Sequence, residues 1–153
     1  SGGARPRLSS RLRAAWTDAL PVQIIGIVEN ELQPETVEPR ARSPRSRITV
    51  RPAFSTALDG LEVGHRVQIL FYFDRAPATA PLRQHPRGNR DVPRRGVFAL
   101  RSPHRPSPIG LTTVKILAVE SDALVVAGLD AWNGTPVIDI KPYAHSLDAS
   151  PSQ

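Results

Sequence analysis

From Val22 onward the chain is a succession of seven short runs rich in Val, Ile, Leu and Phe, with turn-forming residues between them. Runs of this length and composition are typical of β-strands, and almost no helical periodicity separates them. The pattern therefore predicts an all-β domain, either a barrel or a sandwich. The expected strands are Val22–Val28, Arg47–Val50, His65–Phe73, Gly96–Leu100, Leu111–Val119, Leu124–Leu129 and Pro136–Ile140.

The pattern also predicts details of the longest strand and of the connections between strands. In the longest run, one face carries Val67, Ile69, Phe71 and Phe73, and the opposite face carries Leu70 and Tyr72, so we expect both faces to be covered. The polar run 120–122 predicts a hairpin turn. Ser55–Leu61 predicts one helical turn ended by Gly60. Residues 74–95 are expected to be a long structureless segment, which is either a ligand-binding loop or disordered.

Composition excludes several classes of site. Cysteine and methionine are absent, so disulfides, thiolate metal sites and a cysteine nucleophile are excluded. The four histidines, His65, His85, His104 and His145, do not have the spacing of metal ligands, and we expect no metal site. No apolar run is long enough to span a membrane and no signal-peptide core is present, so a soluble, cytoplasmic protein is expected.

The basic charge is carried almost entirely by arginine. The formal net charge is +6, and the chain has eighteen arginines but only two lysines, Lys115 and Lys141. Five arginines fall within 40–51 and seven within 83–105. Guanidinium groups pair in a two-pronged manner with phosphate and stack on bases, so RNA or DNA is the leading candidate partner. A GC-rich genome, which favours arginine codons, is the alternative explanation of the bias itself.

The segment Gly96–Leu111, GVFALRSPHRPSPIGL, is rigid and cationic. It places three prolines, two arginines and a histidine between two apolar runs. Proline fixes its own backbone and holds the preceding residue extended, so the segment loses little entropy when it binds an anionic or planar ligand. The alternative is a stiff surface loop without a ligand.

A second distinctive run, 128–143, contains a tight Asn-Gly turn followed by a strand. The alternation of that strand puts Asp139 and Lys141 on the same side. They either form a solvated ion pair or stand at the mouth of a pocket, suited to proton transfer or to holding a charged ligand.

These residues resemble a known family. GVFALRSPHRPSPIGL, NGTPVIDIKPY, IIGIVEN and LDGLEVGHRVQILFYFDR are similar to segments of the YaeB-like (TsaA-like) family, and the resemblance runs from about residue 23 to 143. That family transfers a methyl group from S-adenosylmethionine to the exocyclic amine of threonylcarbamoyladenosine next to the tRNA anticodon. The resemblance implies a small antiparallel β-barrel of about seven strands with long Pro/Arg-rich loops, a homodimer, and a methyl donor bound near the subunit interface.

The resemblance also implies roles for individual residues. Donor contacts fall on Asp74, Arg75, Arg101, Leu111, Asn133, Gly134, Thr135 and Pro136, and by a weaker alignment on Glu38, Pro39 and Arg40. Contacts to tRNA are expected from Arg95, Arg105, Lys141 and Tyr143, with Arg101 sharing in them. An adenine amine is a poor nucleophile, so a base should remove its proton, and the candidates are Asp139 and His104, with Asp74 third.

The chain departs from the family pattern at three positions, where Asp74, Ser107 and Asn133 replace the usual His, Asn and Asp. Longer bacterial members carry an extra C-terminal domain. Two alternatives therefore stay open: a methyltransferase of the same fold with another substrate, and a noncatalytic RNA-binding barrel. We divide the chain into a basic arm with a short helix at Leu8–Trp16 (1–21), the barrel domain (22–145) and a tail (146–153).

Overall fold

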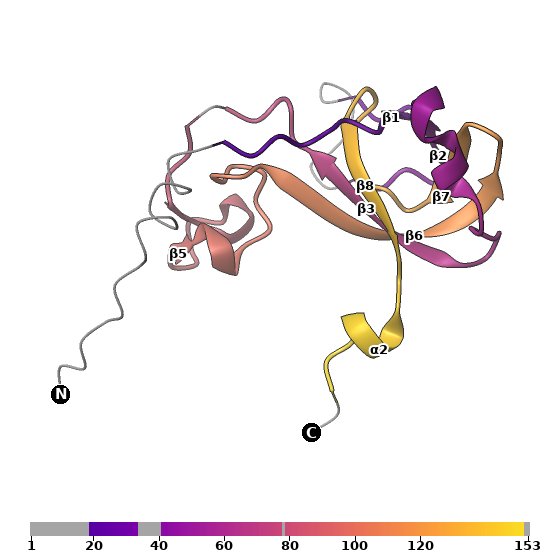
Figure 1. The fold of residues 1–153 in the computed structure, drawn as a ribbon. Coiled ribbons are helices and arrows are strands. Elements are labelled where there is room, and N and C mark those ends of the chain that lie inside the picture. Colours follow the sequence, from indigo (N-terminus) through magenta and orange to yellow (C-terminus); the bar gives the residue numbers. More distant parts are fainter. Residues whose placement is uncertain (1–18, 34–40, 78, 152–153) are drawn as a thin grey trace, which may run out of the picture.

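Six antiparallel strands close into a barrel in the order β1-β2-β7-β6-β3-β8 (Figure 1). The computed structural model describes residues 19–33, 41–77 and 79–151. The barrel strands are β1 Gly26–Glu29, β2 Ser46–Val50, β3 Arg66–Tyr72, β6 Ile109–Val119, β7 Ala123–Ala127 and β8 Pro136–Pro142. The predicted all-β barrel is confirmed, with one strand fewer in the barrel than expected. The predicted helix at 8–16 lies outside the described residues.

Two predicted strands are wrong in whole or in part. The run expected as Gly96–Leu100 forms only the end of β5 (Arg95–Gly96), and the 3-10 helix η3 (Val97–Ala99) follows it. The reason is that Val97 is buried while Phe98 points to solvent, and the Leu100 amide donates to the Val97 carbonyl, which closes a turn. The first strand begins at Gly26 and not at Val22.

The long loop expected at 74–95 is partly ordered. Arg83–Gln84 (β4) pairs with β5, and a second 3-10 helix, η2 (Pro86–Gly88), lies between them. We call residues 79–95 the arginine module. Figure 1 shows β5 and the turns around it standing apart from the barrel strands. The Gln84 side-chain amide joins the module to residues 96–111, the proline-rich segment, by donating to the His104 carbonyl at 2.7 Å.

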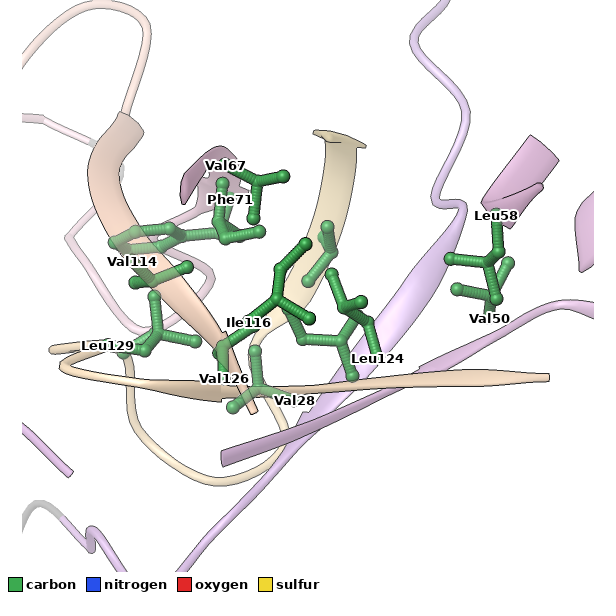
Figure 2. Close-up of a cluster of buried hydrophobic side chains, with 14 residues drawn as sticks. Val28, Val50, Leu58, Val67, Phe71, Val114, Ile116, Leu124, Val126 and Leu129 are labelled. Atoms are coloured by element: carbon green, nitrogen blue, oxygen red, sulfur yellow. The ribbon is translucent and has the colours of Figure 1, made fainter. Parts of the chain in front are cut away.

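The barrel interior is filled by side chains from all six barrel strands, at alternate positions in β2, β3, β6 and β7 (Figure 2). From β3, Val67, Ile69 and Phe71 point inward and are at most 2% exposed. The opposite face of β3 is less covered than expected, since Tyr72 is 43% exposed. The 3-10 helix η1 (Pro52–Leu58) contributes the buried Leu58, and Gly60 follows it with a positive φ of 93°, close to the predicted helical turn. Other buried members of the cluster are Val28, Ile48, Val50, Val114, Ile116, Leu124, Val126, Leu129, Ala131 and Val137.

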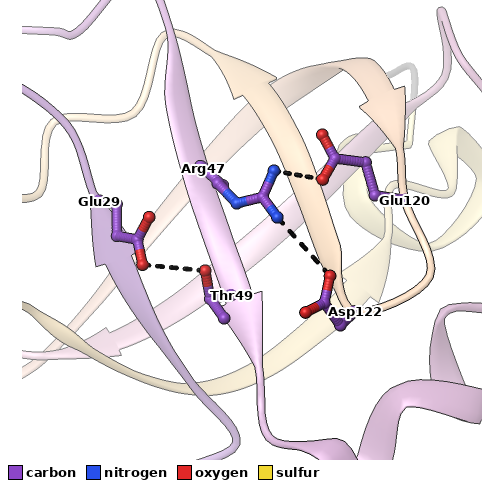
Figure 3. A network of polar contacts seen from close by, with 5 residues as sticks. All are labelled: Glu29, Arg47, Thr49, Glu120 and Asp122. Carbon is purple, nitrogen blue, oxygen red and sulfur yellow. Dashed lines mark hydrogen bonds and ion pairs between the residues drawn. The ribbon is translucent and has the colours of Figure 1, made fainter.

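The hairpin turn predicted at 120–122 is confirmed between β6 and β7. The Glu120 amide donates to the Ala123 carbonyl at 2.8 Å. Arg47 of β2 forms ion pairs with Glu120 and, at 3.6 Å, with Asp122, so the turn is tied to the outside of the barrel (Figure 3). All three side chains are more than a third exposed, and such pairs contribute little to stability.

Candidate functional site

The central strand β3 brings the two distinctive segments of the sequence to one outer surface. Its Leu70 is in register with Leu111 of β6 on one side and with Asp139 of β8 on the other. We call these three residues the outer row. Neighbouring strands are separated by about 4.8 Å, so Leu111 and Asp139 stand roughly 10 Å apart. The Arg101 guanidinium donates to the Leu111 carbonyl at 3.1 Å and so reaches the same row.

Asp139 and Lys141 lie on the same side of β8, as predicted. Their carboxylate and ammonium groups form an ion pair of 2.9 Å, and the Asp139 side chain is 46% exposed. The other carboxylate oxygen of Asp139 accepts the amide of Ile140 at 2.9 Å. Both oxygens are therefore engaged, although the Lys141 ammonium, itself 60% exposed, is free to exchange its partner for an anionic ligand.

The proline-rich segment is held by one of its own arginines. The Arg105 guanidinium donates to the carbonyl of Leu100 at 2.8 Å and to that of Ser102 at 3.2 Å. The Ser102 hydroxyl in turn accepts the His104 amide at 3.1 Å. Arg105 thus fixes the turn, whereas the His104 and Arg101 side chains are exposed to solvent. The segment presents a histidine and an arginine on a rigid support.

The Asn-Gly turn has a structural role in closing the barrel. The Asn133 side-chain oxygen accepts the Asn30 amide at 3.0 Å, and the Gly134 amide donates to the Val28 carbonyl at 2.7 Å. Gly134 has a φ of 87°, which favours glycine. The buried Thr135 donates its hydroxyl to the Trp132 carbonyl at 2.7 Å. An aspartate at 133 would accept the same bond, so the asparagine keeps the geometry of the turn.

The residues after β3 reach this turn. The Arg75 guanidinium lies over the Trp132 ring, 5.9 Å from its centre. Arg75 of the predicted donor-binding pair thus lies against Trp132, the residue before the predicted donor-binding turn 133–136. Asp74 is exposed, and its amide donates to the Tyr72 carbonyl at 2.9 Å.

Other predicted site residues lie farther away. Tyr143 is four residues beyond Asp139, about 13 Å along the strand direction. Arg95 is exposed on β5 in the arginine module. Glu38, Pro39 and Arg40 lie outside the described residues. The sequence did not predict which residues face the site residues across neighbouring strands, such as Leu70 between Leu111 and Asp139. The pattern within one strand does not indicate its register with a strand far away in the chain.

Within the ranges that the structure describes, no group of three or more His, Asp or Glu side chains is placed to hold a metal ion. The helices found in those ranges are all too short or too polar to cross a membrane.

Comparisons with known proteins agree on one family. The model of the tRNA-methyltransferase O N-terminal domain matches residues 31–149. An S-adenosyl-L-methionine-binding protein of Archaeoglobus fulgidus is 38% identical over 127 residues, which cover 81% of this chain and 89% of that protein. A human tRNA (adenine(37)-N6)-methyltransferase is 44% identical over 108 residues, which cover 69% of this chain and 23% of that protein.

Solved structures agree with the sequence comparisons. The crystal structure of TrmO from Pseudomonas aeruginosa matches with a TM-score of 0.70 and 32% identity, over 89% of this chain and 61% of that one. The chain thus spans only part of the length of the human and Pseudomonas proteins. Because the family model covers most of the chain and the barrel superposes on TrmO, this protein belongs to the tRNA-methyltransferase O N-terminal domain family.

Proposed function

We propose that this protein is an S-adenosylmethionine-dependent tRNA methyltransferase that modifies the exocyclic amine of threonylcarbamoyladenosine next to the anticodon. The observation that carries the proposal is the outer row, which sets the proline-rich segment and the Asp139–Lys141 pair across a single strand from each other. Family membership supports the same reaction class, since the human relative is named for methyl transfer to adenine 37 of tRNA.

The residues present fit the donor and the substrate chemically. A bound donor supplies a methyl group on a sulfonium, which the amine nitrogen attacks in line as the carbon–sulfur bond breaks. The exposed carboxylate of Asp74 would face the positive charge of the sulfonium. The Arg101 guanidinium donates one N–H to the Leu111 carbonyl, and its other N–H groups are available to bind a carboxylate of the ligand. Asp139 or His104 would accept the proton that the amine loses, and Lys141 would hold the threonyl carboxylate.

The arginine module supplies the electrostatic part of tRNA binding. Five of its arginines are exposed, namely Arg83, Arg87, Arg90, Arg94 and Arg95. Exposed guanidinium groups release counterions when they meet phosphate, which makes binding tight and salt-dependent. The cytoplasm is the expected compartment for an enzyme with this substrate.

The proposal is tested by incubating the protein with labelled donor and tRNA that carries the threonylcarbamoyl group. Label should enter the modified adenosine, and tRNA without the threonylcarbamoyl group should accept little. Donor binding by calorimetry without transfer to either tRNA would indicate a different methyl acceptor. Salt-sensitive RNA binding without donor binding would contradict enzymatic function.

We also propose that two copies of the chain associate through the outer face of β3 and β6 at the end where Tyr72 meets Ile109, away from Arg66 and Lys115. Tyr72 and Ile109 are in register there and are 43% and 40% exposed. Leu111, two residues beyond Ile109 on the same face of β6, is 39% exposed. Exposed apolar side chains grouped in this way are typical of interaction surfaces. A second copy would cover them and would complete the surroundings of the outer row.

Ile109→Asp is expected to convert a dimer into a monomer, because it places a charge where apolar surface would be buried. Sedimentation equilibrium or light scattering measures the change. Val63→Asp is the matched control, since Val63 is 64% exposed in the loop before β3, at the opposite end of that strand, and the same substitution there should leave the molecular mass unchanged. A wild-type chain that is monomeric at all concentrations would refute the interface.

A further inference from the structure

At the end of β3 that lies away from the arginine module, two cationic side chains stand opposite each other on neighbouring strands. Arg66, the first residue of β3, is in register with Lys115 of β6. On its other side, the Tyr143 amide donates to the Arg66 carbonyl at 3.0 Å, which extends the β3–β8 ladder by one residue. We call Tyr143, Arg66 and Lys115 the polar row. Arg66 and Lys115 are both exposed, whereas their neighbours Val67 and Val114 are buried.

The pairing of Arg66 with Lys115 is unfavourable for the isolated protein. Like charges directly opposite each other on antiparallel strands repel and destabilise the sheet. In the parts of the chain that the structure describes, neither Arg66 nor Lys115 has a carboxylate within salt-bridge distance. An external anion placed between the two side chains would remove the repulsion. The arrangement therefore favours a phosphate as the missing partner.

A hollow of about 410 Å³ adjoins the polar row. The residues that line it are Tyr143, His65 and Arg66, together with the apolar Leu61 and Pro142. This volume is within the range of pockets that hold small organic groups. Aromatic and cationic side chains at one opening are the usual surroundings of an unpaired nucleobase next to its phosphate. The acidic neighbour Glu62, 3.5 Å from the His65 ring nitrogen, is itself strongly exposed.

We propose that the polar row and its hollow form a second RNA-binding surface, on which Arg66 and Lys115 hold the tRNA backbone and Tyr143 stacks on an unpaired base. The inference rests on the proposed function for the identity of the RNA. It goes beyond that function because the surface is distinct from the outer row: Arg66 is four residues from Leu70 of that row, about 13 Å along β3. A tRNA that reaches both ends of the strand would be held at two separate points.

The test measures binding of a fluorescent tRNA transcript by anisotropy at several salt concentrations. Arg66→Gln combined with Lys115→Gln should raise the dissociation constant about tenfold and lower the slope of log affinity against log salt by about 1.5. The matched control exchanges the two cations, Arg66→Lys with Lys115→Arg, and should keep the wild-type slope. Tyr143→Leu should weaken binding about tenfold with no change in slope, and Tyr143→Phe should restore it.

Each result has a definite meaning. Thermal melting and donor calorimetry on the same variants report folding and the donor site independently of RNA. An unchanged dissociation constant and slope in the Gln–Gln variant, with wild-type melting, would overturn the second surface even if the protein methylates tRNA. If the protein bound no donor, the proposed function would fail, while a loss of RNA binding in this variant would still support the surface.

Discussion

Replacing Asp139 with asparagine is expected to slow methyl transfer to tRNA by about 10²- to 10⁴-fold, the usual contribution of a general base. Asparagine keeps the shape of the side chain and can still accept the Ile140 amide, but it cannot take up a proton or pair with Lys141. Single-turnover kinetics with saturating donor and tRNA measures the chemical step. Calorimetric donor affinity should stay close to that of the wild type, because the change removes only one exposed charge.

His104→Gln is the companion variant for this experiment. His104 is the other candidate base and lies in the proline-rich segment. Its backbone amide donates a hydrogen bond to the Ser102 hydroxyl, and this bond does not depend on the imidazole ring. If Asp139 is the base, the glutamine variant should lose less than about tenfold in rate. The opposite ranking would assign the proton transfer to His104 and leave Asp139 as the positioning partner of Lys141.

Phe71→Ala is expected to destabilise the fold by about 3–5 kcal/mol, the range measured when a large aromatic side chain is removed from a core. Phe71 is 2% exposed, and its ring meets that of Phe73 edge to face with 5.2 Å between centres. Urea or guanidinium unfolding gives the free energy directly. Tyr72→Ala is the matched control, because its side chain is 43% exposed and should cost less than about 1.5 kcal/mol.

The position opposite Phe71 gives an independent check on this packing. A Cβ atom added at Gly110 would lie 2.5 Å from the Phe71 ring, far inside contact distance. Gly110→Ala should therefore cost about 1–3 kcal/mol. Part of that loss should disappear in the Phe71→Leu background, where only the Phe73 ring, 2.9 Å from the same Cβ position, still stands in the way. Strictly additive losses would mean that the two residues do not meet.

The sequence predicted the strands whose pattern is set by burial. The alternation of Val67, Ile69 and Phe71 predicted the strand β3 and the face of it that points into the barrel. An apolar residue at every second position is buried on one face of a strand only in one register. The prediction failed at Val97–Ala99, where an apolar run folds as a 3-10 turn. The Leu100 amide closes that turn on the Val97 carbonyl, and the Arg105 guanidinium binds the Leu100 carbonyl. Hydrogen bonds of this kind leave no periodic pattern in the sequence.

The candidate site was predictable in its parts but not in its assembly. The strand pattern put Asp139 and Lys141 on one side, and the ion pair confirms it. Resemblance to the family selected Arg101 and Arg75 as site residues. Only the register of β3 with its two neighbours shows that Arg101 and Asp139 share a surface, and only that register reveals the pairing of Arg66 with Lys115.

The turn at 133–135 bonds to β1 and so fastens the place where the barrel closes on itself, through the Gly134 and Val28 amides. Under the proposed function the same turn also touches the methyl donor. A ligand bound to this turn would then oppose separation of β1 from β8, and ligand binding would raise the melting temperature of the protein. At a hundredfold excess over the dissociation constant, this linkage amounts to about 2.7 kcal/mol. Candidate nucleosides added one at a time at the same concentration would thus be ranked by their shift in melting temperature, without any methyl acceptor.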